Sequence, residues 1–214
     1  MSDIRVVGLD IAKSVFQLHG VDAGGATVLQ KRLTRGRLLA FFTKLPPCLI
    51  GIEARASPHY WARELTSLGH EVKLMPAQYV KPYVKRGKND AADAEAICEA
   101  VTRPTMRFVG IKSPDQKSAM MLHRVRLILS RQRTPLSNAL RAHLAEFGII
   151  AAIGRNGIDR LLGVIADPAD GRLPAEARIC LEMLAAQLSI VKQQLLENDR
   201  RIWPVRAAPS LAAG

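Results

Sequence analysis

The spacing of apolar residues changes near residue 90 of this chain, and that change restricts the folds open to it. Before residue 76, short runs rich in β-branched residues end at glycine, proline or an acidic residue, which is typical of buried strands. After residue 90, apolar residues recur every three or four positions, which is typical of helices. The sequence therefore predicts an α/β domain followed by a helical region.

The α/β part is expected to hold a mixed five-stranded sheet. The predicted order of elements is β-β-β-α-β-α-β, which is typical of a layered α/β domain. The strands are predicted over residues 4–9, 14–19, 26–31, 48–52 and 72–75. The helix after the fourth strand is expected to start at Ser57-Pro58, because serine caps helices and proline is tolerated in the first turn.

Two long helices are predicted in the second half. The first spans about residues 114–147, where Pro135 is expected to kink or split it. The second carries a heptad seam from Ala177 to Ile202. This seam predicts pairing with the earlier helix or with another subunit, the alternative being an ordinary amphipathic helix on a globular core. We expect a homo-oligomer formed through this coiled-coil region.

These patterns divide the chain into a catalytic domain (1–110), a helical region (111–203) and a tail without structure (204–214). The net charge is +12, from 31 Lys and Arg against 19 Asp and Glu. Half of that excess lies in residues 111–160, which hold nine basic and three acidic residues (9 − 3 = +6). A strongly basic chain attracts polyanions, so nucleic acid is the expected partner.

Other classes of protein are disfavoured. No apolar run approaches the ~18 residues that span a bilayer, and the N-terminus lacks the pattern of a signal peptide, so we expect a cytoplasmic protein without a membrane partner. Cys48, Cys98 and Cys180 are too far apart in sequence to suggest a disulfide framework or a zinc cluster.

Four carboxylates form the candidate catalytic and metal site. Asp10 and Glu53 follow the first and fourth predicted strands, and strands that neighbour each other would bring both to one edge of the sheet. Asp90 and Asp93, three apart on a helix, would lie about 5–6 Å from each other. As alternatives, Asp10 is a turn residue and Asp90 a helix cap.

Crowded carboxylates repel, so such a cluster is expected to bind divalent cations. Oxygen ligands favour Mg²⁺, with Mn²⁺ as the alternative. Two such ions roughly 3.5–4 Å apart would clamp the attacking and leaving oxygens of a phosphodiester. The acidic cluster therefore predicts phosphodiester chemistry.

Two groups of basic residues are candidates for nucleic-acid binding. One group precedes the acidic pair and the other lies on the first long helix. An exposed loop and a solvated helix face are the respective alternatives. The candidates are Lys85, Arg86, Lys88, Arg124, Arg126, Arg131, Arg133 and Arg141.

Three segments together resemble a known family. They are Val7-Gly8-Leu9-Asp10-Ile11-Ala12-Lys13, Ile52-Glu53-Ala54 and Lys85-Arg86-Gly87-Lys88-Asn89-Asp90-Ala91-Ala92-Asp93-Ala94. In order and spacing they resemble the Asp-Glu-Asp-Asp (DEDD) insertion-sequence transposases related to the pilin-gene invertase. The later helices also resemble the central coiled-coil region of that family.

The resemblance implies a RuvC-like variant of the ribonuclease H fold in which Asp10, Glu53, Asp90 and Asp93 bind Mg²⁺. It implies a DNA transposase or recombinase whose partners are DNA and a structured guide RNA. The family also has a C-terminal domain with a serine that attacks DNA, and we expect that domain to be absent here, so enzymatic activity of this chain is left open. The alternatives are a non-catalytic nucleic-acid-binding and oligomerisation module and a metal-dependent nuclease or junction resolvase.

Overall fold

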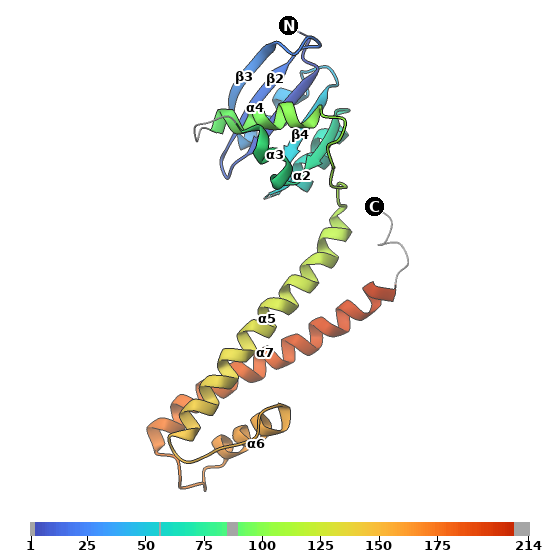
Figure 1. Cartoon of the computed structure of the whole chain (residues 1–214). Helices are drawn as coiled ribbons and strands as arrows, with labels where there is room; N and C mark the ends of the chain where they lie inside the picture. The colour runs from blue at the N-terminus through green and yellow to red at the C-terminus, as the bar shows by residue number, and fades with distance from the viewer. Residues whose placement is uncertain (1–2, 56, 85–89, 208–214) are drawn as a thin grey trace. The chain divides into compact units, whose positions relative to one another are not determined.

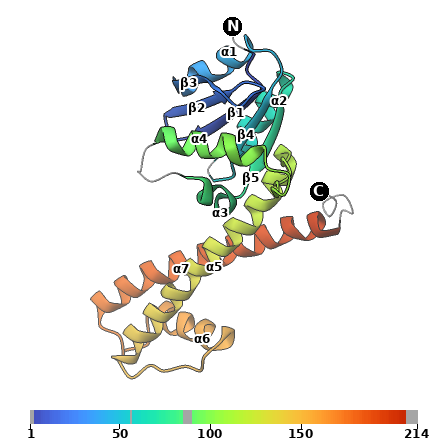
Figure 2. The same ribbon diagram turned by 45° about the horizontal axis from the view of Figure 1, so that its top comes forward.

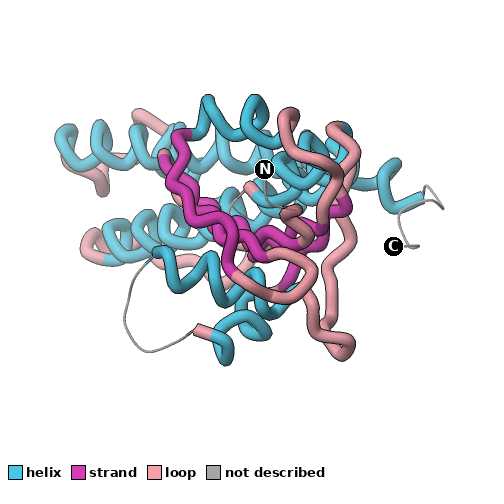
Figure 3. Tube along the Cα trace, turned by 90° about the horizontal axis from the view of Figure 1, so that it is seen from above, coloured by secondary structure: helices cyan, strands magenta, loops and turns pink. Residues whose placement is uncertain are grey.

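The computed structural model describes residues 3–55, 57–84 and 90–207 of the chain (Figure 1). The chain divides into two compact units, Met1–Ser113 and Pro114–Gly214. Each unit has its own buried apolar core. The predicted change from strands to helices is confirmed, since the described strands all belong to the first unit (Figure 3).

The first unit is built on a five-stranded mixed sheet in the order β3-β2-β1-β4-β5 (Figure 2). β1 pairs antiparallel with β2, β2 antiparallel with β3, β4 parallel with β1 and β5 parallel with β4. The strands are β1 (Val6–Ile11), β2 (Val15–Val21), β3 (Thr27–Thr34), β4 (Leu49–Glu53) and β5 (Glu71–Met75). The predicted α/β class and mixed five-stranded sheet are confirmed, and the topology is consistent with the expected RuvC-like fold.

Helices cover both faces of this sheet. A short turn η1 (Arg35–Arg37) leads into α1 (Leu38–Phe42), which packs with α2 (Pro58–Ser67) on one face, over a core that includes Leu9 and Ile52. α4 (Asp90–Val101) covers the other face, where Ile97 and Val101 join a second core. The sequence did not predict the short α3 (Ala77–Val80) and η2 (Lys81–Tyr83) that precede α4.

The second unit is helical. It consists of α5 (Pro114–Ala145), α6 (Arg155–Ala166) and α7 (Ala175–Ala207). α5 and α7 are antiparallel neighbours: Asn198 near the end of α7 donates a hydrogen bond of 3.0 Å to the carbonyl oxygen of Leu122 near the start of α5, while Leu181 packs with Leu140 at their other ends. No helix in the described ranges is both long and apolar enough to cross a membrane.

The heptad seam of α7 is used within the chain. Leu181, Leu188, Val191 and Leu195 are all buried. The earlier helix supplies the partner surface, so of the two predicted pairings the one within a single chain is observed. Asn198 continues the seam as a buried polar residue.

Three features of the second unit differ from expectation. Pro135 was expected to kink or split the first long helix, and the split is not found: α5 continues through Pro135 as one helix, with Leu136, Leu140 and Leu144 on its C-terminal side packed in the core. α7 continues to Ala207, so its last turn covers the start of the tail predicted from residue 204. α6 was not predicted at all.

Candidate metal and catalytic site

Asp10 and Glu53 lie at corresponding positions on neighbouring parallel strands. β1 and β4 are in register, with Gly8 opposite Gly51 and Leu9 opposite Ile52. Asp10 and Glu53 are the next residues along each strand. Parallel strands end at the same edge of a sheet, so the predicted convergence of these two strand ends is found.

The two glycines determine which face of the sheet carries the acids. A Cβ on Gly8 would lie 2.1 Å from the carbonyl oxygen of Ala94, and one on Gly51 would lie 2.8 Å from Cβ of Val101. Both glycines therefore face α4. Because side chains two apart along a strand share a face, Asp10 and Glu53 also project on the α4 side.

The first turn of α4 approaches the same end of β1. Cys98 Sγ contacts the carbonyl oxygen of Val6 at 3.8 Å, and Ala94 lies against Gly8. A residue one turn earlier on α4 therefore lies against a residue two positions later on β1. Asp93, in the first turn, is accordingly brought toward the end of β1 that carries Asp10. Asp90 begins α4, and its side chain lies outside the described residues.

Glu53 is a buried carboxylate whose negative charge is only partly compensated. Its side chain is 8% exposed, and Oε1 accepts a 2.7 Å contact from Nε of Arg55, whose side chain is 70% exposed. Burial raises the pKa of Glu53 above its ordinary value, the charge and hydrogen bond of Arg55 lower it, and the negative charge of Asp93 raises it again. The net upward shift of the pKa indicates a negative charge that the surroundings leave partly uncompensated.

The donor chemistry of this edge fits a hard cation, since Asp10, Glu53 and Asp93 offer carboxylate oxygens. Burial, and to a lesser degree the charge of Asp93, raises the pKa of Glu53, and a divalent cation would offset both effects. Within residues 3–55, 57–84 and 90–207, however, no three His, Cys, Asp or Glu side chains are gathered closely enough to hold a metal ion. The side chain of Asp90, the fourth expected ligand, is not among those described side chains.

The basic candidates fall into different environments. Lys85, Arg86 and Lys88 lie outside the described residues. Arg124, Arg131 and Arg133 are exposed on α5. Arg126 Nε forms an ion pair of 2.6 Å with Asp199. Arg141 has a structural task that the sequence did not reveal, because its guanidinium donates to the carbonyl oxygens of Ala151, Ala152 and Gly154.

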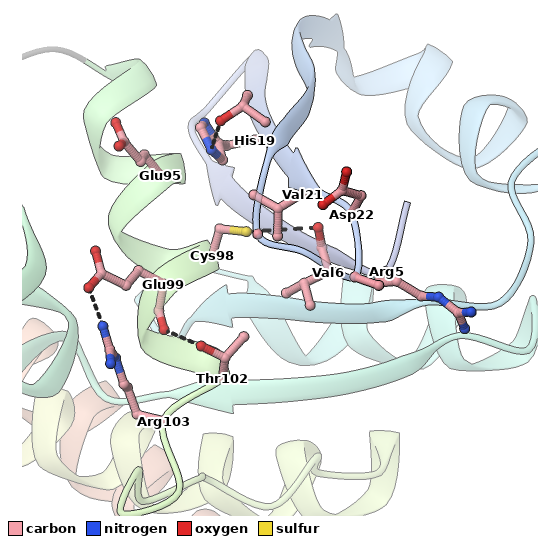
Figure 4. A pocket seen from close by; sticks show the side chains of 13 residues that line it. Arg5, Val6, His19, Val21, Asp22, Glu95, Cys98, Glu99, Thr102 and Arg103 are labelled. Carbon is pink, nitrogen blue, oxygen red and sulfur yellow. Dashed lines mark hydrogen bonds and ion pairs between the residues drawn. The ribbon is translucent and has the colours of Figure 1, made fainter. Parts of the chain in front are cut away.

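A separate pocket of the first unit lies near the start of β1, on the α4 side of the sheet (Figure 4). Glu95, Glu99 and Arg103 line it, and Glu99 is paired with Arg103. Cys98 also lines it, and burial raises the pKa of this thiol to about 11. The pocket adjoins Val6 rather than Asp10, so it is distinct from the acidic edge.

Gly8 and Gly51 are the site residues that sequence reasoning missed. They bind nothing themselves, but they let α4 approach the sheet closely enough to bring Asp93 toward Glu53. A signal was present: glycine precedes the acid by two residues in both strands, as Gly8-Leu9-Asp10 and Gly51-Ile52-Glu53.

Comparison with known proteins gives consistent matches. The model of the DEDD transposase family of IS110-type insertion sequences, described as "Transposase", matches residues 7–149. The transposase for insertion sequence element IS1328 of Yersinia enterocolitica is 39% identical over 202 residues, covering 94% of this chain and 60% of the relative. The transposase for insertion sequence element IS1111A of Coxiella burnetii is 35% identical over 203 residues, covering 94% of this chain and 54% of the relative.

A third relative, y4pF/y4sB of Sinorhizobium fredii, also carries the name transposase. It is 50% identical over 201 residues, covering 91% of this chain and 51% of the relative. The chain therefore spans between 51% and 60% of the length of these three curated relatives.

Proposed function

Because the chain belongs to the DEDD transposase family of IS110-type insertion sequences, we propose that its first unit cleaves and transfers DNA strands at the acidic edge during transposition. Asp10, Glu53, Asp90 and Asp93 would hold Mg²⁺, or Mn²⁺ in its place. When bound, such an ion supplies charge stabilisation to the oxygens of the reacting phosphodiester. The proposal concerns the activity of a protein of which this chain spans part of the length.

One observation carries the proposal. Asp10 and Glu53 directly follow paired residues of two parallel strands, and both project from the face of the sheet that α4 covers. Strands of a packed sheet hold side chains more rigidly than loops do, which suits ligands that must keep a fixed separation. The raised pKa of Glu53 adds support, because a carboxylate kept at this energetic cost is typical of functional sites.

Each chain element has a separate task in this proposal. β1 and β4 fix Asp10 and Glu53, and α4 brings Asp93 and Asp90 to them. Arg55 offsets the charge of Glu53 where no cation is bound, and most of its own side chain is exposed to solvent. Burial of Glu53 excludes water from one side of the site, which strengthens its electrostatic interactions.

We propose DNA as the substrate and a structured RNA as a partner. The relatives from Yersinia and Coxiella are named as transposases for insertion sequence elements, which act on DNA. The net charge of +12 favours polyanions of either kind. A phosphate contact from the exposed guanidinium of Arg133 on α5 would make binding sensitive to salt.

We also propose that the helical unit forms a homo-oligomer, by a surface other than the buried seam. Ile179, Met183 and Ile190 lie on one face of α7 and are 54%, 64% and 55% exposed. Met121 and Ile128 on α5 are 63% and 54% exposed. Light scattering that shows a monomer at high protein concentration would contradict this assembly.

The test combines the chain with element-end DNA, its adjacent RNA and Mg²⁺, and measures strand cleavage, strand transfer and covalent protein–DNA product. We expect cleavage that EDTA abolishes and that Asp10→Asn and Glu53→Gln reduce by at least ~100-fold. Asp115→Asn, an exposed acid at the start of α5, is the matched control and should retain activity.

Two other outcomes would favour the competing functions. Cleavage of branched junctions without strand transfer would favour a nuclease or resolvase, and binding without any reaction would favour a non-catalytic module. Calorimetric titration with Mg²⁺ separates the metal site from the reaction. The proposed site would be contradicted if Mg²⁺ does not bind, or if it binds the Asp10→Asn variant as tightly as the unchanged chain.

A further inference from the structure

The second unit contains a groove that is rich in positive charge. It lies among α5, the start of α6 and α7, and has a volume of about 630 Å³. Its basic lining residues are Arg126, Arg133, Arg141, Arg155 and Lys192. The arginines of α5 are not distinguished by their sequence pattern, whereas this groove separates Arg126, Arg133 and Arg141 from Arg124 and Arg131.

The α5 wall of the groove is a regular polar stripe. Arg126, Ser130, Arg133, Ser137 and Arg141 follow one another at spacings of four, three, four and four residues, which places them on one face of the helix. Hydroxyl groups therefore alternate with guanidinium groups along this wall. Both are donors that protein surfaces commonly present to phosphate oxygens.

The opposite wall is fixed in place by two features. Arg141 donates to the carbonyl oxygens of Ala151 at 3.1 Å, Ala152 at 2.8 Å and Gly154 at 3.1 Å. A Cβ on Gly157 would lie 1.8 Å from the carbonyl oxygen of Ala152, so glycine allows the loop to pack against α6. The groove is thus built by specific contacts.

Positive charge exceeds negative charge around the groove. Asp199 pairs with Arg126, and Asp159 lies 2.6 Å from Lys192 and 3.9 Å from Arg155. Five basic residues thus face two acids, an excess of 5 − 2 = +3. Arg133 is exposed, and no ion pair engages it among the residues that the structure describes.

Apolar side chains complete the lining. Ile158 and Leu195 are buried at its base, whereas Ile153 is 98% and Leu196 61% exposed. Unpaired bases offer apolar faces to such side chains, but the bases of a duplex are stacked and paired. A volume of 630 Å³ lies in the range of pockets that enclose small molecules, so the groove has room for a single nucleotide.

We propose that this groove binds the phosphodiester backbone of a single-stranded nucleic acid and places an unpaired base against Ile153 and Leu196. The site lies in the second unit and does not depend on the acidic edge or on a metal ion. Single-stranded RNA and single-stranded DNA share this chemistry, so the test includes both.

The test compares two double variants of the full 214-residue chain. Arg133→Glu with Arg155→Glu reverses two groove charges, and Arg124→Glu with Arg131→Glu reverses two exposed charges of α5 outside the groove. Fluorescence anisotropy in EDTA would measure binding of labelled 15-residue oligo-U, oligo-dT and a 15-base-pair DNA duplex. The overall change in charge is the same for both variants, so a difference between them reports position.

We expect the groove variant to bind at least one of the single strands at least tenfold more weakly, and the control variant to lose less than threefold. The slope of log K against log salt should decrease by roughly 1.4 in the groove variant, because two phosphate contacts at about 0.7 each are lost. The strand whose affinity falls identifies the sugar that the groove accepts. A loss of affinity for oligo-U alone indicates RNA, and a loss for both strands indicates that the groove binds RNA and DNA alike.

Equal losses in the two variants would overturn the proposal, as would a loss confined to the duplex. If the glutamate pair unfolds, as judged by circular dichroism, Arg133→Gln with Arg155→Gln replaces it, with Arg124→Gln and Arg131→Gln as its control. Binding is measured in EDTA and without strand cleavage, so failure at the acidic edge and failure at the groove are distinguishable.

Discussion

Gly8 on β1 lies directly beneath Ala94 on α4, so close that a Cβ on Gly8 would come within 2.1 Å of the Ala94 carbonyl oxygen. The same missing Cβ would lie 2.4 Å from the backbone nitrogen of Cys98. Neither backbone atom can move without shifting α4 as a whole. This contact therefore sets the height of α4 above the sheet, and with it the position of Asp93.

The first prediction concerns that contact. We expect Gly8→Ala to lower the free energy of unfolding by at least about 2 kcal/mol, because overpacking against backbone displaces a helix. Gly51→Ala should cost less, since its new Cβ would lie 2.8 Å from Cβ of Val101, a smaller overlap than the 2.1 Å approach to a carbonyl oxygen at Gly8. Gly36→Ala, in open space, is the control and should stay within about 0.5 kcal/mol. Urea unfolding measures all three, and equal values would contradict the assignment.

The second prediction concerns Glu53 without metal. Its pKa is raised in the folded protein, so ionised Glu53 opposes folding, and stability is lost as pH rises from the ordinary pKa of 4.5 through the folded one. In EDTA at pH 7, Glu53→Gln should therefore raise Tm, and the difference should vanish at a pH where both states are protonated. Glu71→Gln, on exposed Glu71 of β5, is the control. A lower Tm for Glu53→Gln would show that the contact with Arg55 outweighs burial.

The third prediction concerns Glu53 with metal. A carboxylate must be deprotonated to bind a cation, so Mg²⁺ should raise Tm at neutral pH and lose this effect as pH falls through the raised pKa of Glu53. The loss should begin above the pH at which an ordinary glutamate titrates. Thermal unfolding with and without Mg²⁺ across pH measures it. A Mg²⁺ effect that persists in Glu53→Gln would contradict the role of Glu53.

The fourth prediction concerns Arg141. Its guanidinium holds three carbonyl oxygens of the loop before α6, and removing it leaves them without a charged donor. We expect Arg141→Ala to destabilise the second unit by about 2–3 kcal/mol, with faster amide hydrogen exchange in residues 149–158. Arg133→Ala, on the same helix but exposed, should cost less than about 0.5 kcal/mol. Unchanged exchange in Arg141→Ala would contradict this structural task.

The fifth prediction concerns the buried amide of Asn198. Its side-chain amide lies within an apolar seam and donates a hydrogen bond of 3.0 Å to the carbonyl oxygen of Leu122. Asn198→Leu should raise Tm while weakening the fixed register between α5 and α7, since a buried polar residue gives specificity at a cost in stability. Sedimentation velocity should then detect larger species. Gln194→Leu, exposed on α7, is the control; a decrease in Tm for Asn198→Leu alone would contradict the prediction.

The sequence by itself determined the α/β class, the number of strands and the two long helices, because these depend on periodicity and turn residues that act over short distances. The Gly-x-acid spacing in β1 and β4 also lies within single strands, so it too is encoded locally. The heptad seam on α7 was readable for the same reason. Its partner was not, because residues 122 and 198 share no local signal.

Tertiary structure alone decided what these local patterns do. It placed Asp10 and Glu53 on one face through the register of two strands whose paired residues are 43 positions apart, and it buried Glu53 so that its pKa rises. It also gave Arg141 carbonyl partners while leaving Arg133 exposed, although both are arginines on one helix. Burial, register and partner choice depend on atoms distant in the chain, and no pattern of neighbouring residues encodes them.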